Sequence, residues 1–336
     1  MIRNLLTLTL LLAATTVAQT SFSESQPYKP KAKSKASTTP SAATSRDFVI
    51  PFSVLDKNGM PVTDLTRDQV MVLVDRVEAE VTAFETPREL PNIVLLLDMS
   101  PSTALRVEKI KEQARDFVNA LPAGARVLVA QFNSTLNIPT QLTEDRNEIL
   151  EGIKKAQFGD GTSLYSTIET MAEKVLPLVP GKKVVVIFSD GVDTTSKKGG
   201  EARSLRALEK SAVPFYAVLH DTSTDRKPGA SLGNRGILGN HWPLPPGLIG
   251  QGTRGSSREE YERGREYLDD LGLATGGRVL NGEKFDEAIK SFVVELSSIY
   301  YVTISVPRNG SLASRPVRVR INRRDLNVMA KGSFVE

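Results

Sequence analysis

Between residues 91 and 296 the sequence alternates regularly between two kinds of segment. Runs at 93–97, 127–132 and 184–188 are apolar almost throughout, as expected of parallel strands that are buried on both faces. The segments between such runs place apolar residues three and four positions apart, which is typical of amphipathic helices. This alternation predicts an α/β fold, namely a doubly wound, mostly parallel six-stranded sheet with helices on both faces.

Strand-like sequence lies on both sides of this α/β segment. The runs are 48–55, 70–74 and 77–84 before it, and 300–306, 316–321 and 326–335 after it. Three short strands do not form a stable domain alone, so we expect the two sets to pair into one small β-sandwich. The predicted organisation is N-terminal strands at 46–88, an inserted α/β domain at 89–298 and C-terminal strands at 299–336.

The first residues have the features of an export signal. Arg3 precedes an apolar stretch at 5–17, and small residues stand before Gln19, which is the order of a secretory signal. We expect a signal peptide at 1–18 and an exported protein in the periplasm, at the cell surface or secreted; the alternative is a short uncleaved anchor. Residues 19–45 are rich in Ser, Thr, Pro and Lys, which predicts a disordered linker.

Composition excludes several functions. The chain has no cysteine and only two histidines, so disulfides, thiolate sites and a multi-histidine zinc site are excluded. An exported chain without cysteine favours a bacterial origin. The net charge of +4 over 336 residues indicates no nucleic-acid partner. No further apolar run is long enough to span a membrane in the mature chain, and nothing indicates the oligomeric state.

One long stretch fits neither the strand nor the helix pattern. Residues 221–258 are rich in glycine and proline and contain Trp242, the single tryptophan of the chain. Structureless loops of this length are uncommon in compact domains and are often functional or disordered. Two interpretations stay open: a partner-binding tip with Trp242 as its aromatic anchor, or a flexible insertion without a role.

Oxygen-bearing side chains follow the predicted buried strands. Asp98, Ser100 and Ser102 come directly after the first strand, Asp190 follows another, and Thr162 stands just before a helix. Ligand sites on doubly wound sheets lie at the carboxyl ends of the strands, so these three segments are expected to converge. A set of oxygen ligands suits a hard cation such as Mg²⁺.

The pattern Asp98-x-Ser100-x-Ser102, followed by Thr162 and Asp190, resembles the metal-ion-dependent adhesion site of von Willebrand factor type A domains. The resemblance covers residues 92–298. Three further stretches are similar to a bacterial exported subfamily, namely 54–85, 274–280 and 300–335.

The resemblance implies a role for each motif residue. Ser100, Ser102 and Thr162 would bind Mg²⁺, or Mn²⁺ or Ca²⁺, directly through their hydroxyl oxygens, and Asp98 and Asp190 would hold it through water. Since the direct ligands are neutral, the cation keeps affinity for one more anionic ligand at an open position. The expected function is divalent-cation-dependent capture of an Asp or Glu carboxylate of a partner protein.

Two other functions remain open. The protein could be a non-catalytic scaffold of an envelope complex, with a metal site that is structural or vestigial. It could also be a metal-dependent phosphoesterase with Asp98 as nucleophile. Haloacid-dehalogenase-like phosphatases need a second carboxylate two residues later, however, and Ser100 stands there. A glycine-rich phosphate loop that ends in Lys-Ser or Lys-Thr is also absent, so we expect no enzyme.

Overall fold

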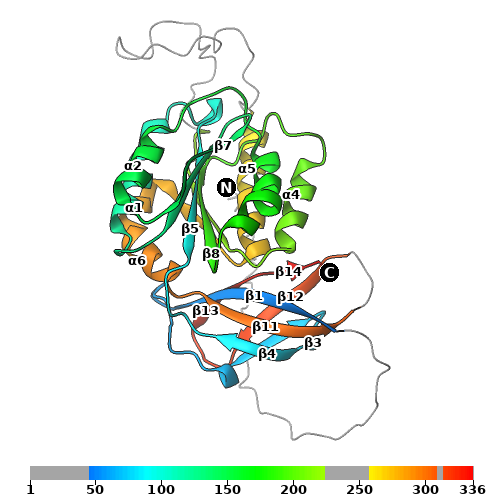
Figure 1. Ribbon diagram of the computed structural model, residues 1–336. Helices are drawn as coiled ribbons and strands as arrows, with labels where there is room; N and C mark the ends of the chain where they lie inside the picture. The colour runs from blue at the N-terminus through cyan, green and yellow to red at the C-terminus, as the bar shows by residue number, and fades with distance from the viewer. Residues whose placement is uncertain (1–44, 224–256, 309–312, 336) are drawn as a thin grey trace, which may run out of the picture. The chain divides into compact units, whose positions relative to one another are not determined.

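The computed structural model describes residues 45–223, 257–308 and 313–335 (Figure 1). Within these ranges six strands form one sheet in the order β10-β9-β8-β5-β6-β7. All neighbours are parallel except β7, which pairs antiparallel with β6 at one edge. The strands are β5 (Asn92–Asp98), β6 (Val127–Phe132), β7 (Leu136–Thr143), β8 (Lys183–Ser189), β9 (Phe215–Leu219) and β10 (Val279–Asn281). The predicted fold class is confirmed.

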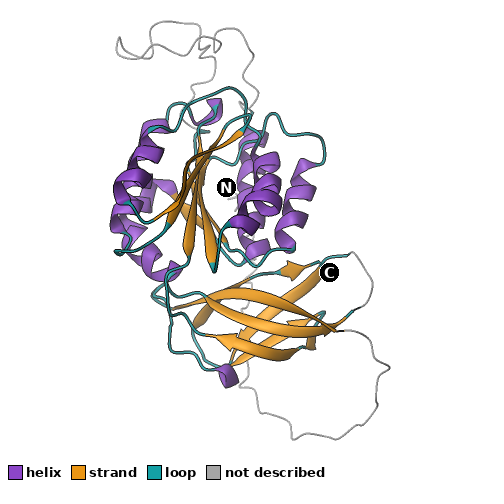
Figure 2. Ribbon diagram, viewed as in Figure 1, coloured by secondary structure: helices purple, strands orange, loops and turns teal. Residues whose placement is uncertain are grey.

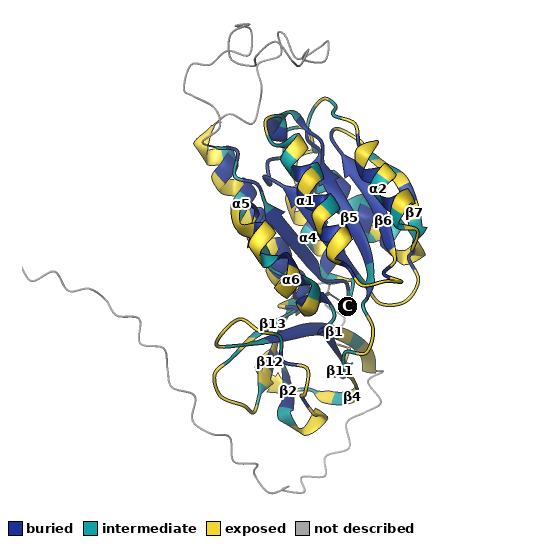
Figure 3. Cartoon of the chain, turned by 90° about the vertical axis from the view of Figure 1, so that its left-hand side faces the viewer, coloured by how far each residue is buried: buried dark blue, intermediate teal, exposed yellow. Residues whose placement is uncertain are grey.

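Helices cover both faces of this sheet (Figure 2). They are α1 (Val107–Ala120), α2 (Arg146–Lys154), α3 (Leu164–Thr170), α4 (Gly200–Glu209), α5 (Arg258–Thr275) and α6 (Phe285–Leu296). Side chains alternate along β5, so Ile93 and Leu95 pack under α1, α2 and α6, whereas Val94 and Leu96 pack under α3, α4 and α5. A strand between two helical layers must be apolar on both sides, and β5 and β6 are buried along their length (Figure 3).

The strands at the two ends of the sequence pair with each other. One antiparallel sheet has the order β13-β1-β11-β4, and a second has the order β14-β12-β2-β3. Their bounds are β1 (Ser45–Asp56), β2 (Val70–Val74), β3 (Val77–Glu78), β4 (Glu80–Glu85), β11 (Tyr300–Pro307), β12 (Arg315–Ile321), β13 (Leu326–Ala330) and β14 (Ser333–Phe334). Apolar side chains of both sheets share one core, as the β-sandwich prediction requires.

Two of the predicted strands are wrong in one respect, because each is divided between two sheets. The run at 77–84 becomes β3, which pairs with β2, and β4, which pairs with β11. The run at 326–335 becomes β13 and β14, with Lys331 and Gly332 between them. There Gly332 N donates to Leu273 O at 2.9 Å, and Lys331 is buried. An apolar pattern does not reveal that a chain changes partners within it.

Several predictions lie outside the described residues. These are the signal peptide at 1–18, the linker at 19–45 apart from Ser45, and Trp242 with all but the ends of the 221–258 insertion. They stay predictions. Among the residues that the structure does describe, no helix combines the length and the apolar character that a membrane span needs.

Candidate metal site

The three segments that carry the predicted ligands meet at the carboxyl edge of the large sheet. Strands β5 and β8 are parallel neighbours, so Asp98 at the end of β5 and Asp190 just after β8 emerge side by side. The segment before α3 joins them, because Gly159 N donates to Met99 O at 3.0 Å and Ser163 N donates to Asn133 O at 2.8 Å. Thr162 lies within this segment. Topology thus places all three loops together, as parallel strands predict.

Four of the predicted residues are linked by hydrogen bonds. The hydroxyls of Ser100 and Ser102 are 3.0 Å apart, and Ser102 Oγ donates to Asp190 Oδ1 at 3.2 Å. Asp98 Oδ1 accepts a bond from the backbone N–H of Ser100 at 3.2 Å. All four side chains are buried. The residues therefore form one oxygen-rich cluster rather than separate polar positions.

Two hydroxyls outside the predicted motif hold the carboxylates. Ser189 Oγ donates to Asp98 Oδ2 at 2.6 Å, and Thr222 Oγ1 donates to Asp190 Oδ2 at 2.9 Å. Neither residue was predicted from the sequence. Ser189 directly precedes Asp190, and this position could have indicated that its hydroxyl lies at the site. No local pattern marks Thr222, which comes close only because β9 lies beside β8.

Thr162 is fixed through its backbone, while its hydroxyl has no hydrogen-bond partner in the part of the chain that the structure describes. Thr162 N donates to Thr194 Oγ1 at 2.9 Å, and Thr162 O accepts from the N–H groups of Thr194 and Thr195 at 2.8 and 3.0 Å. Gly161 precedes it with φ of 68°, a left-handed conformation that favours glycine. Thr162 Oγ1 is buried without a partner among the described residues. Such a hydroxyl costs about 1–3 kcal/mol, so the arrangement is one that a bound ligand would complete.

The two carboxylates of the cluster lie close together in a water-poor environment. Burial and the neighbouring Asp190 carboxylate raise the pKa of Asp98 well above its usual range. In the described part of the chain, no three His, Cys, Asp or Glu side chains gather as a metal cluster, so carboxylates alone would not make this site. Two carboxylates with three hydroxyls are hard oxygen donors, and this set suits Mg²⁺. The residues present therefore fit a divalent cation.

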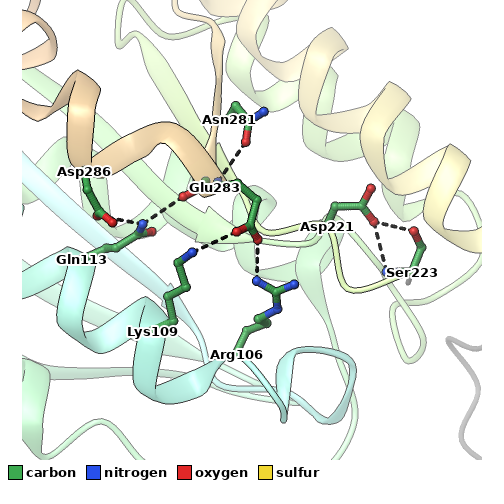
Figure 4. Close-up of polar contacts among 9 residues, drawn as sticks. Arg106, Lys109, Gln113, Asp221, Ser223, Asn281, Glu283 and Asp286 are labelled. Carbon is green, nitrogen blue, oxygen red and sulfur yellow. Dashed lines mark hydrogen bonds and ion pairs between the residues drawn. The ribbon is translucent and has the colours of Figure 1, made fainter. Parts of the chain in front are cut away.

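The loop that carries the serines is also held at its far end (Figure 4). Arg106 and Lys109, at the start of α1, both form ion pairs with Glu283. The distance between Lys109 Nζ and Glu283 Oε2 is 2.9 Å. One turn later Gln113 Nε2 donates to Gly282 O at 2.8 Å and to Asp286 Oδ1 at 2.9 Å. Since Asp98 is fixed in β5, the loop from 99 to 106 has both ends tied to the fold.

This combination defines a class of protein: a doubly wound α/β domain with a buried cluster of hydroxyl and carboxylate oxygens at the carboxyl edge of its sheet. Residues 93–192 match the family model of the von Willebrand factor type A domain. The matched stretch includes Asp98, Ser100, Ser102, Thr162 and Asp190. Over this stretch the chain is therefore similar to the von Willebrand factor type A domain.

Three solved structures illustrate what this chain is similar to. One is an aerotolerance-related membrane protein from Bacteroides fragilis NCTC 9343 with multiple mutations to serines (16% identity, TM-score 0.42, 61% of this chain and 98% of the other). Another is the conserved hypothetical protein BatB from Bacteroides thetaiotaomicron (17% identity, TM-score 0.42, 62% of this chain and 98% of the other). A third is a von Willebrand factor type A protein from Catenulispora acidiphila (11% identity, TM-score 0.44, 87% of this chain and 74% of the other). Comparison with curated proteins gave no match.

Proposed function

We propose that this protein is an exported, divalent-cation-dependent binding module that captures an Asp or Glu side chain of a partner protein. The observation that carries the proposal is the buried hydroxyl of Thr162, which has no partner among the described residues and lies in the segment that meets the loops carrying the buried oxygens. An orphaned buried polar group destabilises the native state, and a bound cation would give this hydroxyl a partner.

Each residue of the cluster has a distinct role in this proposal. Ser100, Ser102 and Thr162 offer neutral oxygens to the cation, which is Mg²⁺, or alternatively Mn²⁺ or Ca²⁺. Asp190 Oδ1 accepts a hydrogen bond from Ser102 Oγ at 3.2 Å, which leaves the lone pairs of the serine oxygen pointing away from Asp190. Asp98 is oriented by Ser189 and by the N–H of Ser100. When bound, the cation supplies a positive centre with an open position for an external carboxylate.

The charge balance supports a cation in particular. Without one, burial and the repulsion from the Asp190 carboxylate both raise the pKa of Asp98. A divalent cation offsets this repulsion and needs deprotonated ligands. Because the direct ligands are neutral, the cation keeps affinity for a partner's carboxylate. Partner binding therefore depends on the metal. Export is part of the proposal on the strength of the signal-like first residues.

Two measurements test the proposal. Isothermal titration of the mature chain with Mg²⁺, Mn²⁺ and Ca²⁺ should show binding of one ion per chain, and Asp98→Asn should abolish it. Immobilised protein should then retain a partner from a bacterial envelope extract in Mg²⁺, and EDTA should release that partner. The immobilised Asp98→Asn variant should not retain it.

The alternatives predict different results. Absence of metal uptake by the wild-type chain would refute the proposal. Metal uptake with capture that persists in EDTA would indicate a scaffold with a structural metal. Turnover of a phosphoester such as p-nitrophenyl phosphate, lost in Asp98→Asn, would indicate an enzyme.

A further inference from the structure

Thr222 joins the metal cluster from outside the motif. It follows β9 and is 2% exposed. Its Oγ1 donates to Asp190 Oδ2 at 2.9 Å, while Asp190 Oδ1 accepts from Ser102 Oγ at 3.2 Å and from Val192 N at 3.0 Å. Both oxygens of the Asp190 carboxylate therefore accept hydrogen bonds. Thr222 donates to Oδ2, whereas Ser102 and Val192 donate to Oδ1.

This division of donors fixes the orientation of the carboxylate. A carboxylate held at one oxygen can still rotate about its last bond, which tilts its plane relative to Ser102. The Thr222 hydroxyl holds the second oxygen and so limits that rotation. Groups that orient metal ligands in this way commonly change metal affinity by about 10- to 100-fold when they are removed.

The residues around Thr222 are themselves tied to the fold. We call residues 220–223, where the chain leaves β9 toward the predicted insertion, the insertion root. His220 N donates to Ser189 O at 2.9 Å. Asp221 Oδ1 accepts from Ser223 N at 3.0 Å and from Ser223 Oγ at 2.5 Å (Figure 4), and Asp221 Oδ2 pairs with Arg265 of α5 at 3.1 Å.

We propose that Thr222 is a positioning residue for Asp190, and that through this hydrogen bond the insertion root sets the affinity of the site for its cation. The inference rests on the proposed metal-binding function. It adds a residue that the five-residue motif does not contain. It also links the metal site to α5, since the Asp221–Arg265 pair holds the backbone on which Thr222 is presented.

The first test compares Thr222→Val with Thr222→Ser. Valine keeps the shape of the side chain and removes the hydroxyl, whereas serine keeps the hydroxyl. We expect Thr222→Val to weaken Mg²⁺ binding, measured by isothermal titration of the mature chain, by about tenfold or more. Thr222→Ser should bind Mg²⁺ within about threefold of the wild type.

Thr140 provides a matched control. It is a buried threonine of the same sheet, on edge strand β7, and its Oγ1 donates to Glu148 O at 3.3 Å. Thr140→Val removes an equivalent hydroxyl away from the cluster and should leave the Mg²⁺ affinity unchanged. Melting temperatures of all variants in EDTA then show how much of any effect is loss of fold stability.

The outcomes separate the two proposals. If the wild type takes up no cation, both fail. If the wild type binds and Thr222→Val binds equally well, only the inference fails. An equal loss of melting temperature in EDTA and in Mg²⁺, with the affinity unchanged, would show that Thr222 is merely structural.

Arg265→Gln tests the link to α5 and should weaken Mg²⁺ binding, but less than Thr222→Val. An unchanged affinity would refute that link.

Discussion

Two buried polar clusters in this protein differ in what completes them. At the end of α4, Lys331 is 2% exposed, and its Nζ donates to the carbonyl oxygens of Ser211 and, at 2.6 Å, Glu209. The last carbonyls of a helix lack partners within the helix and carry partial negative charge, so the ammonium and the helix end satisfy each other. At the metal cluster, by contrast, Asp98 and Asp190 repel and Thr162 Oγ1 has no partner among the described residues.

The difference separates a structural cluster from the cluster that we propose binds a cation. Around Lys331 the chain supplies both the charge and its acceptors. Burial still lowers the pKa of Lys331 to about 8, against the opposing effect of Glu209, so the side chain stays mainly protonated at neutral pH. Around Asp98 the chain supplies hydroxyl donors to the two carboxylates, and the proposed cation would supply the positive charge. The first cluster should therefore not depend on an added cation, whereas the second should contribute to stability only when a cation is present.

The largest expected effect tests the structural cluster. Lys331→Met removes the buried donor and leaves helix-end carbonyls unsatisfied, so the free energy of unfolding should fall by about 3 kcal/mol. Urea denaturation in EDTA measures this loss, and the Mg²⁺ affinity of the folded variant should be unchanged. Lys57→Met, at an exposed turn, is the control. A Lys331→Met variant as stable as the control would contradict the comparison.

The next effect concerns the binding cluster. Mg²⁺ at about 100 times its dissociation constant should stabilise the wild type by about 2.7 kcal/mol, because a ligand that binds only the native state shifts the folding equilibrium. Thermal denaturation in Mg²⁺ and in EDTA measures the shift. Asp98→Asn should melt at the same temperature in both buffers. A stabilisation that survives in Asp98→Asn would place the cation elsewhere.

A smaller effect separates ligand binding from packing at Thr162. In EDTA, Thr162→Val should be as stable as the wild type or more stable by about 1 kcal/mol, since it removes an unsatisfied buried hydroxyl. Its Mg²⁺ affinity should nevertheless fall by about tenfold, which corresponds to about 1.4 kcal/mol. Urea denaturation and isothermal titration measure the two quantities. A clear loss of stability in EDTA would show that the hydroxyl has a structural partner after all.

The smallest effect is a pH dependence in EDTA. The pKa of Asp98 is raised in the native state, so between its unfolded and native pKa values the native state binds more protons. The free energy of unfolding contributed by this group therefore falls as the pH rises through that interval. Lowering the pH from neutral toward the unfolded-state pKa of a carboxyl group should stabilise the wild type relative to Asp98→Asn. Saturating Mg²⁺ should remove the difference; identical pH profiles in EDTA would argue against the buried repulsion.

Much of the architecture could be predicted because it depends on local pattern. Strands β5 and β8 are apolar at nearly every position, which only a strand covered on both faces tolerates. The side chains after them were recognisable because Asp98, Ser100 and Ser102 lie close in sequence and because carboxyl ends of parallel strands share one edge. The prediction went wrong at 77–84 and 326–335, where the apolar pattern is continuous but the strand partners change.

The sequence by itself determined which oxygen donors exist and which edge of the sheet they reach, since residue type and strand period fix both. Only the tertiary structure decided what each donor contacts. Ser189 and Thr222 hold the two carboxylates, whereas Thr162 Oγ1 is left without a partner among the described residues. The reason is physical: hydrogen bonds and burial depend on distances between segments far apart in the chain, and no pattern along a single segment records those distances.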